Sequence, residues 1–224
     1  MFLFADEFLY NFMSWRTLWI AGRLGGGKTA LAVALADYLI QRKHAAGVIA
    51  NFPHALPLHP WREPAHDGRP RGIRGAVIIF DEAWQLLDRR TWQTNDRSYG
   101  AYARKLETFW IFPSVFALDI RLSILSCRRQ TMIQTPFFQA WLYKWALHAP
   151  GVEHGGRFLW ISPEKYFGTY DTRYVPIDDG DIKLLWRATL NMLIDDESAQ
   201  ESVVRTAASP IQHLLAGFGD EATE

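Results

Sequence analysis

The 224 residues are enough for one α/β domain with additions, and two full domains are not expected. Hydrophobic residues make up 49% of the chain and aromatic residues 14%, which excludes a disordered chain. The formal net charge is zero, which excludes a general polyanion binder.

Residues 1–14 are apolar, but they contain Asp6 and Glu7 and lack a basic segment, so we do not interpret them as a signal peptide. Phe4, Phe8 and Phe12 recur at the spacing of one helical face. We therefore expect a short N-terminal helix that docks on the rest of the protein.

Residues 17–29 carry the clearest chemical pattern in the chain. A buried strand is predicted over residues 18–21, residues 22–29 fit G-x-x-x-x-G-K-[ST], and a helix is predicted over residues 28–43. Glycines let backbone N–H groups converge on phosphate oxygens, and the helix points its positive end at the same place. Lys28 is expected on the β- and γ-phosphates and the Thr29 hydroxyl on Mg²⁺. The predicted nucleotide-binding residues of this segment are Gly22, Gly25, Gly26, Gly27, Lys28, Thr29 and Ala30.

A second strand, over residues 47–51, completes a β-α-β unit and so predicts a parallel sheet. Residues 52–75 are rich in proline and glycine and have no period, which is typical of a functional or mobile loop. His54, His59 and His66 lie in this loop, but no acidic or cysteine partner stands at a ligand spacing. No metal site is expected there.

The apolar run 76–80 is followed by Asp81 and Glu82. A run buried on both faces belongs in the middle of a parallel sheet, and ligands bind at the carboxyl ends of such strands. We therefore predict that Asp81 holds Mg²⁺ and that Glu82 orients and activates the attacking water. The alternative is that the two acids only begin a helix.

Two further strands are predicted over residues 108–112 and 122–126. Ser114 follows the first of them and is a candidate sensor of the γ-phosphate. Arg128 and Arg129 come just past the second, where an arginine can supply a transition-state cation to a neighbouring subunit. Arg104 is a third candidate for that role, and an ordinary basic surface pair is the alternative interpretation of Arg128 and Arg129.

The C-terminal third is expected to add helices and edge strands. Phe137, Trp141 and Trp145 form a stripe that predicts a helix over residues 137–148. Edge strands are predicted over 157–162 and 170–175, and a last helix from Asp181 to about residue 194. Residues 195–224 are predicted to form an acidic tail with a short helix.

The most apolar stretch, residues 109–127, is interrupted by Pro113, Asp119 and Arg121, so we predict no transmembrane span and a soluble chain, with a peripheral membrane association left open. Cys127 is the only cysteine, which rules out an internal disulfide and fits a reducing compartment. We expect its thiol to be inert. The predicted fold class is α/β: a three-layer α/β/α P-loop NTPase domain over residues 15–194 with a mostly parallel central sheet, preceded by a docking helix (1–14) and followed by the tail (195–224).

With the phosphate-loop motif and the Asp81-Glu82 pair both located, the chain resembles the FtsK–HerA branch of P-loop ATPases. Within that branch it resembles the zonula occludens toxin (Zot)-like assembly ATPases of filamentous phages and related mobile elements. The resemblance covers about residues 15–175. Four stretches carry it: residues 22–29, 50–51 (Ala-Asn), 79–84 (Ile-Phe-Asp-Glu-Ala-Trp) and 167–172 (Phe-Gly-Thr-Tyr-Asp-Thr). The first motif is generic to P-loop families, and the combination points to this one.

Two departures stand beside this resemblance. Such ATPases often place a Gln after the strand that follows the Asp-Glu pair, and here Ser114 is nearest to its place. Many Zot-like proteins carry a transmembrane segment after the ATPase domain, where this chain has an acidic tail. The second departure brings virion DNA-packaging ATPases of the same superfamily into contention.

The resemblance implies an Mg²⁺-dependent ATPase that assembles or extrudes virus particles, or packages or translocates DNA, as a homo-oligomeric ring. It implies ATP and Mg²⁺ as cofactors, DNA and phage coat or membrane assembly proteins as partners, and a place in the host cytoplasm, at the inner membrane or on the virion. The basic loops 52–75 and 89–105 would face DNA. Two other classes stay open: a P-loop phosphotransferase, which needs no water-activating Glu, and a nonhydrolysing scaffold that nucleotide stabilises.

Overall fold

The structure is a computed structural model that describes residues 1–61, 72–82, 103–115, 125–149 and 152–171. The chain divides into two compact units, Met1–Ile177 and Asp178–Glu224. The second unit lies outside the described residues, and with it the predicted helix 181–194 and the tail 195–224. The domain boundaries proposed from the sequence stay predictions.

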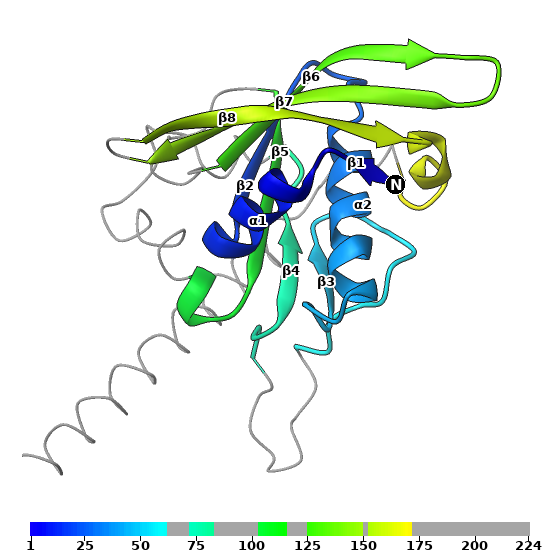
Figure 1. Ribbon diagram of the computed structural model, residues 1–224. Helices are drawn as coiled ribbons and strands as arrows, with labels where there is room; N and C mark the ends of the chain where they lie inside the picture. The colour runs from blue at the N-terminus through cyan, green and yellow to red at the C-terminus, as the bar shows by residue number, and fades with distance from the viewer. Residues whose placement is uncertain (62–71, 83–102, 116–124, 150–151, 172–224) are drawn as a thin grey trace, which may run out of the picture. The chain divides into compact units, whose positions relative to one another are not determined.

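The described strands form a single eight-stranded sheet in the order β1-β8-β7-β6-β2-β5-β4-β3 (Figure 1). Five strands, from β6 to β3 in that order, run parallel, and β7, β8 and β1 are added antiparallel at one side. The mostly parallel sheet expected from the sequence is confirmed. The strands are β1 (Phe2–Leu3), β2 (Thr17–Ala21), β3 (Gly47–Ala50), β4 (Ala76–Ile79), β5 (Phe109–Ser114), β6 (Leu125–Gln134), β7 (Gln139–Ala149) and β8 (Val152–Ile161).

The two strands that carry the chemical motifs are not neighbours. β2 precedes the phosphate loop and β4 precedes Asp81, and β5 lies between them, parallel to both. Ser114, the last residue of β5, is fully buried and level with Ala21 at the end of β2. Three parallel strands therefore bring the phosphate loop, Ser114 and Asp81 to the same edge of the sheet.

Helix α2 (Lys28–Gln41) follows the phosphate loop and is made largely of Ala and Leu, which are strong helix formers. Its residues from Ala30 to Ala36 are all buried, as expected for a helix that is apolar on every side. The helix packs on β5, β2 and β3 on one side and contacts the short helix η3 (Pro163–Tyr166) on another. A buried helix of this kind holds the loop at its N-terminus firmly.

Helix α1 (Asp6–Trp15) docks on the same face of the sheet as α2 (Figure 1). Phe8 stacks on Phe158 of β8 with 4.5 Å between ring centroids, and Phe12 packs on Phe109 of β5. Phe4, which the sequence pattern placed on the same stripe, is 80% exposed and precedes the helix with a φ of 55°. The expected docking contact is therefore made by Phe8 and Phe12 alone of those three.

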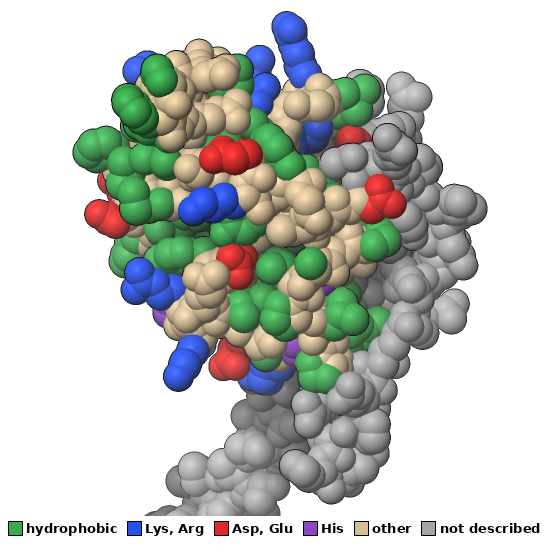
Figure 2. Space-filling model, turned by 90° about the vertical axis from the view of Figure 1, so that its right-hand side faces the viewer, with side chains coloured by type: hydrophobic (Ala, Val, Ile, Leu, Met, Phe, Trp, Pro, Cys, Tyr) green, Lys and Arg blue, Asp and Glu red, His purple; other side chains and the backbone are tan. Residues whose placement is uncertain are grey.

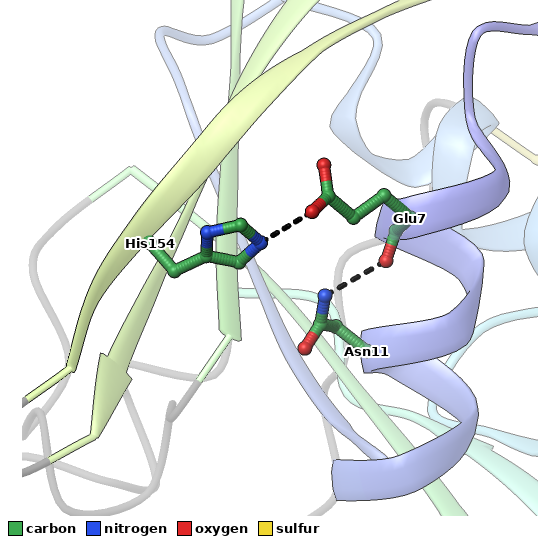
Figure 3. Close-up of polar contacts among 3 residues, drawn as sticks. All are labelled: Glu7, Asn11 and His154. Carbon is green, nitrogen blue, oxygen red and sulfur yellow. Dashed lines mark hydrogen bonds and ion pairs between the residues drawn. The ribbon is translucent and has the colours of Figure 1, made fainter.

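A polar pair joins α1 to β8 beside this aromatic contact. Glu7 and His154 form an ion pair of 2.6 Å between Glu7 Oε1 and His154 Nε2 (Figure 3). The Asn11 side chain donates to the Glu7 carbonyl at 2.8 Å. Both side chains are about half exposed, so this pair is a surface contact rather than part of the core.

The helix predicted over residues 137–148 is wrong, because this segment is strand β7. The predicted stripe relied on a spacing of four residues, which fits a helix and is also twice the two-residue period of a strand. Tyr143, midway between Trp141 and Trp145, decides between the two, because all three are buried on one face while Leu142 and Lys144 are more exposed. Alternating aromatic residues are typical of a half-buried strand.

β6 and β7 form a long hairpin that continues beyond the other parallel strands, with β8 paired along β7 (Figure 1). Near its turn Met132, Ile133 and Phe138 are partly exposed and Phe137 is 93% exposed. Figure 2, which looks onto the side towards which the hairpin extends, shows hydrophobic side chains lying among polar ones.

Two further predictions concern the edge strands and a membrane span. The strand expected at residues 157–162 is β8, but it lies between β1 and β7 rather than at the sheet edge. Tyr170 forms a single β-bridge with His54, and residues 172–175 lie outside the described residues. Within the described residues, no helix has the length and apolar character that crossing a membrane requires.

Candidate nucleotide-binding site

The three glycines of the loop are each required by the backbone. Gly25 and Gly27 have φ angles of 67° and 76°, which residues other than glycine rarely adopt. A Cβ on Gly26 would lie 2.7 Å from the carbonyl oxygen of Arg23, which accepts the Gly26 N–H. Gly27 is the N-cap of α2, and no side chain caps that end of the helix. The loop therefore presents the unpaired N–H end of α2 to an anion.

Lys28 lies at the start of α2 with only 7% of its surface exposed. Its ammonium group donates to the carbonyl oxygen of Arg23, at 3.2 Å, across the base of the loop. A buried ammonium held by one carbonyl is poised to exchange that partner for phosphate oxygens. The predicted role of Lys28 fits this position.

Thr29 and Asp81 meet across the edge of the sheet. The Thr29 hydroxyl donates to Asp81 Oδ2 at 2.6 Å, although the two residues are 52 positions apart. Asn51, which follows β3, holds the backbone of Asp81 from the other side. Its side chain accepts from the Asp81 N–H at 2.8 Å and donates to the Asp81 carbonyl at 2.9 Å. Asn51 is thus a positioning residue that the sequence analysis named only as part of a resemblance.

Burial and hydrogen bonding act on the pKa of the Asp81 carboxyl in opposite directions. Burial raises the pKa of the Asp81 carboxyl above its usual value, while the hydrogen bonds from Thr29 and from the Glu82 N–H lower it. Glu82 itself has a φ of 52°, a strained conformation for a residue with a side chain. Strain of this kind is common where a side chain must be aimed at a ligand.

The three glycines of the loop, Lys28, Thr29, Asp81 and Glu82 line one cavity of about 380 Å³, a volume within the range of small-ligand sites. Gly22, Ala30, Ser114, Arg128 and Arg129, which the sequence also proposed for the site, are not among its described lining residues. The lining residues are Leu24, Gly25, Gly26, Gly27, Lys28, Thr29, Phe52, Asp81, Glu82, Trp141, Phe167, Tyr170 and Asp171.

Four aromatic residues of this lining were missed by the sequence analysis as site residues. Phe52 follows β3, Trp141 is in β7, and Phe167 and Tyr170 belong to the segment 162–171 that follows β8. The motif at 167–172 was a signal for the last two, but no local pattern links it to the phosphate loop.

The segment 162–171, which we call the strap, is tied to three parts of the fold. Its Ser162 N–H donates to the Gln139 carbonyl at the start of β7, and the Tyr166 hydroxyl donates to Asp37 of α2 at 2.9 Å. Burial and this bond raise the pKa of Tyr166 to about 12. The Thr169 carbonyl accepts from Ala55 in the segment after β3. These bonds fix Phe167 and Tyr170 at the cavity.

The expectation that Arg128 and Arg129 lie just past a strand is wrong, because both lie within β6. β6 extends further than predicted because β7 pairs with it along its whole length. Arg129 lies over the Trp141 ring, 4.5 Å from its centroid, and Arg104 lies over Trp15. Arg128 is exposed and level with Ala21.

The donor set fits Mg²⁺. A hydroxyl and a carboxylate, already in contact, are the hard oxygen ligands that Mg²⁺ prefers, and this ion takes its other ligands from water and phosphate. No group of three or more His, Cys, Asp or Glu side chains that could hold a metal occurs among the described residues. The cavity is thus suited to an ion that arrives with a phosphate chain.

Solved structures that are similar to this chain include the following three. The N-terminal domain of zonular occludens toxin from Neisseria meningitidis is 14% identical, with a TM-score of 0.45, over 69% of this chain and 98% of that one. The DNA-packaging ATPase B204 of Sulfolobus turreted icosahedral virus is 12% identical, with a TM-score of 0.40, over 62% and 95%. The genome packaging NTPase B204 of Sulfolobus turreted icosahedral virus 2, in complex with ATP-gammaS, is 13% identical, with a TM-score of 0.36, over 54% and 77%.

These structures are of the kinds that the residues of the chain resemble, a Zot domain and viral packaging ATPases. No protein-family model and no curated protein matches the chain.

Proposed function

We propose that the chain is an Mg²⁺-dependent ATPase that drives virus assembly or extrusion, or DNA packaging or translocation. The observation that best supports this proposal is the 2.6 Å hydrogen bond between Thr29 Oγ1 and Asp81 Oδ2. This contact joins the end of the phosphate-loop motif to the carboxylate that follows β4, in a cavity that Glu82 also lines.

Each residue has a role in this proposal. Lys28 exchanges its bond to the Arg23 carbonyl for phosphate oxygens, and Thr29 and ionised Asp81 hold the metal ion. Bound Mg²⁺ supplies neutralisation of charge on the phosphate chain. Glu82 accepts a proton from the water that attacks the γ-phosphorus, as the bond from that phosphorus to the bridging oxygen breaks and ADP and phosphate form.

The proposal includes a homo-oligomeric ring in which an arginine of the adjacent subunit completes each site. Arg128 is our candidate, because it is exposed, whereas Arg129 and Arg104 each stack on a tryptophan. Membership of the FtsK–HerA branch, Ser114 as a γ-phosphate sensor, and the partners and location implied by the sequence belong to the same proposal.

The three-layer α/β/α architecture is also proposed. Helices α1 and α2 cover one face of the sheet. Ile78, Trp110 and Phe112 alternate with residues of that face, and all three are buried. Burial of both faces is what a layer on each side of the sheet produces.

The test is ATP turnover per chain, measured over a range of protein concentrations, with and without DNA. We expect turnover to rise with concentration and with DNA, and to vanish when Mg²⁺ is removed. Glu82→Gln should lower turnover by about 100-fold or more while ATP still binds. Glu164→Gln, at an exposed residue outside the cavity lining, is the matched control and should change nothing.

Other results would favour other classes. Turnover retained in Glu82→Gln would contradict the hydrolytic role and favour a phosphotransferase. No turnover in the wild type, with ATP still raising the melting temperature, would favour a nucleotide-stabilised scaffold.

A further inference from the structure

We infer that Phe167, backed by Trp141, is the platform on which the base of a bound nucleotide stacks. The inference rests on the proposed function, because it names the part of the cavity that receives the nucleoside. It assigns a role to the side of the cavity formed by Trp141 and Phe167, which we call the aromatic wall and which the phosphate-loop chemistry does not use.

The order of the strands gives the phosphate chain a direction. Asp81 and Glu82 follow β4, on one side of the phosphate-loop strand β2, and Trp141 is in β7, on the other side. The γ-phosphate is the end that must reach Asp81 and Glu82. The nucleoside end of the same molecule therefore points towards β6 and β7, where the aromatic wall stands.

The wall adjoins the end of the phosphate loop. A Cβ placed on Gly27 would lie 2.0 Å from Cζ3 of Trp141, so the indole ring packs directly on the loop backbone. The Arg129 guanidinium also lies over the Trp141 ring, 4.5 Å from its centroid. Trp141 is 4% exposed and forms the fixed back of the wall.

Phe167 presents the accessible surface of the wall. Its ring centroid lies 5.7 Å from that of Trp141, with the planes tilted by 35°, and the residue is 43% exposed although it lines the cavity. The strap holds it in place, since the Phe167 N–H donates to the Glu164 carbonyl and Tyr166 is bonded to α2. A large aromatic ring held open at the mouth of a cavity is suited to stack on a flat ligand.

The experiment compares two ligands that share a phosphate chain, Mg²⁺-ATP and Mg²⁺-tripolyphosphate, by calorimetric titration of the full chain. Phe167→Ala should weaken ATP binding by about 5- to 150-fold, the range that loss of base–aromatic stacking gives, and leave tripolyphosphate binding unchanged. Phe167→Tyr should retain ATP affinity. Phe137→Ala, which removes an exposed Phe away from the cavity, is the matched control and should alter neither ligand.

Two results would overturn the platform: ATP affinity that stays within twofold in Phe167→Ala, or ATP and tripolyphosphate weakened equally, which would mean that the strap only supports the loop. Lys28→Ala should weaken the binding of both ligands, which tests the phosphate-binding loop separately from the platform. A wild type that binds ATP through Phe167 but does not turn it over would refute the ATPase and keep the platform. A wild type that binds neither ligand would refute both.

Discussion

Gly27 is the residue at which the phosphate loop, helix α2 and the β6–β7 hairpin meet. Its φ of 76° favours glycine, and its missing side chain is the space that the Trp141 ring fills. Gly25 has a similar φ of 67°, but a Cβ there would meet nothing within 4 Å. Substitutions at the two glycines therefore distinguish the effect of backbone strain from the effect of steric crowding.

We predict that Gly27→Ala lowers the free energy of unfolding by about 2–4 kcal/mol, because left-handed strain and overpacking add. Gly25→Ala should cost about 1–2 kcal/mol, from strain alone. Urea unfolding of the two variants tests this. Equal losses in the two variants would show that the Trp141 contact relaxes without strain.

Asp81 gives a prediction with a defined pH dependence. Its folded-state pKa is raised, so the neutral form is favoured in the native state, and the stability that this provides is present at low pH and is lost as the pH rises through the folded pKa. Without Mg²⁺ at pH 7, Asp81→Asn should therefore melt at a higher temperature than the wild type. It should also lose Mg²⁺-dependent turnover.

The measurement is thermal unfolding in a chelating buffer between pH 7 and pH 4. The gap between Asp81→Asn and the wild type should close as the pH falls, because wild-type Asp81 becomes neutral. A gap that widens at low pH would mean that the hydrogen bonds from Thr29 and Glu82 outweigh burial.

Among the elements, helix α1 is small but carries part of the core. Phe8 is fully buried between Phe158 and Trp145, whereas Tyr10, two positions on, is 72% exposed. Phe8→Ala should lower the free energy of unfolding by about 3–5 kcal/mol through lost burial and the cavity left behind. Tyr10→Ala on the same helix should have little effect. Denaturant titration of both variants checks this.

The Glu7–His154 pair shows that this docking is apolar rather than ionic. Because both side chains are about half exposed, Glu7→Gln should cost less than about 1 kcal/mol (Figure 3). A loss as large as that of Phe8→Ala would contradict this ranking.

At the scale of the whole molecule, Cys127 reports on opening of the sheet. It is the only cysteine, it is 1% exposed, and it lies in β6 between β2 and β7. Burial raises the pKa of its thiol, which fits the inert thiol expected from the sequence. Labelling by a thiol reagent therefore requires the sheet to open.

We predict that nucleotide protects Cys127. If the opening that exposes it also disrupts the cavity, Mg²⁺-ATP at 100 times its dissociation constant should slow labelling by about 100-fold. The rate of thiol modification of the native chain, with and without nucleotide, gives the answer. Equal rates would show that β6 opens without disturbing the phosphate loop.

The sequence by itself determined the parts of this protein that depend on neighbouring residues. The strand, glycine turn and helix at residues 17–41, and the buried strand before Asp81, follow from local patterns of burial and backbone freedom. The parallel sheet followed from the β-α-β unit. The same local reasoning failed at residues 137–148, because a spacing of four suits both helical and strand periods and only pairing with β6 and β8 decides between them.

Only the tertiary structure decided what surrounds the phosphate loop. Thr29 meets Asp81 across β5, which lies between β2 and β4, and Asn51 holds Asp81 because β3 pairs with β4. Trp141 of β7 packs against Gly27 of the loop, and the strap, which is bonded to α2 through Tyr166, brings Phe167 to the same cavity. Contacts between segments so distant in the chain depend on the packing of whole elements, which no local pattern encodes.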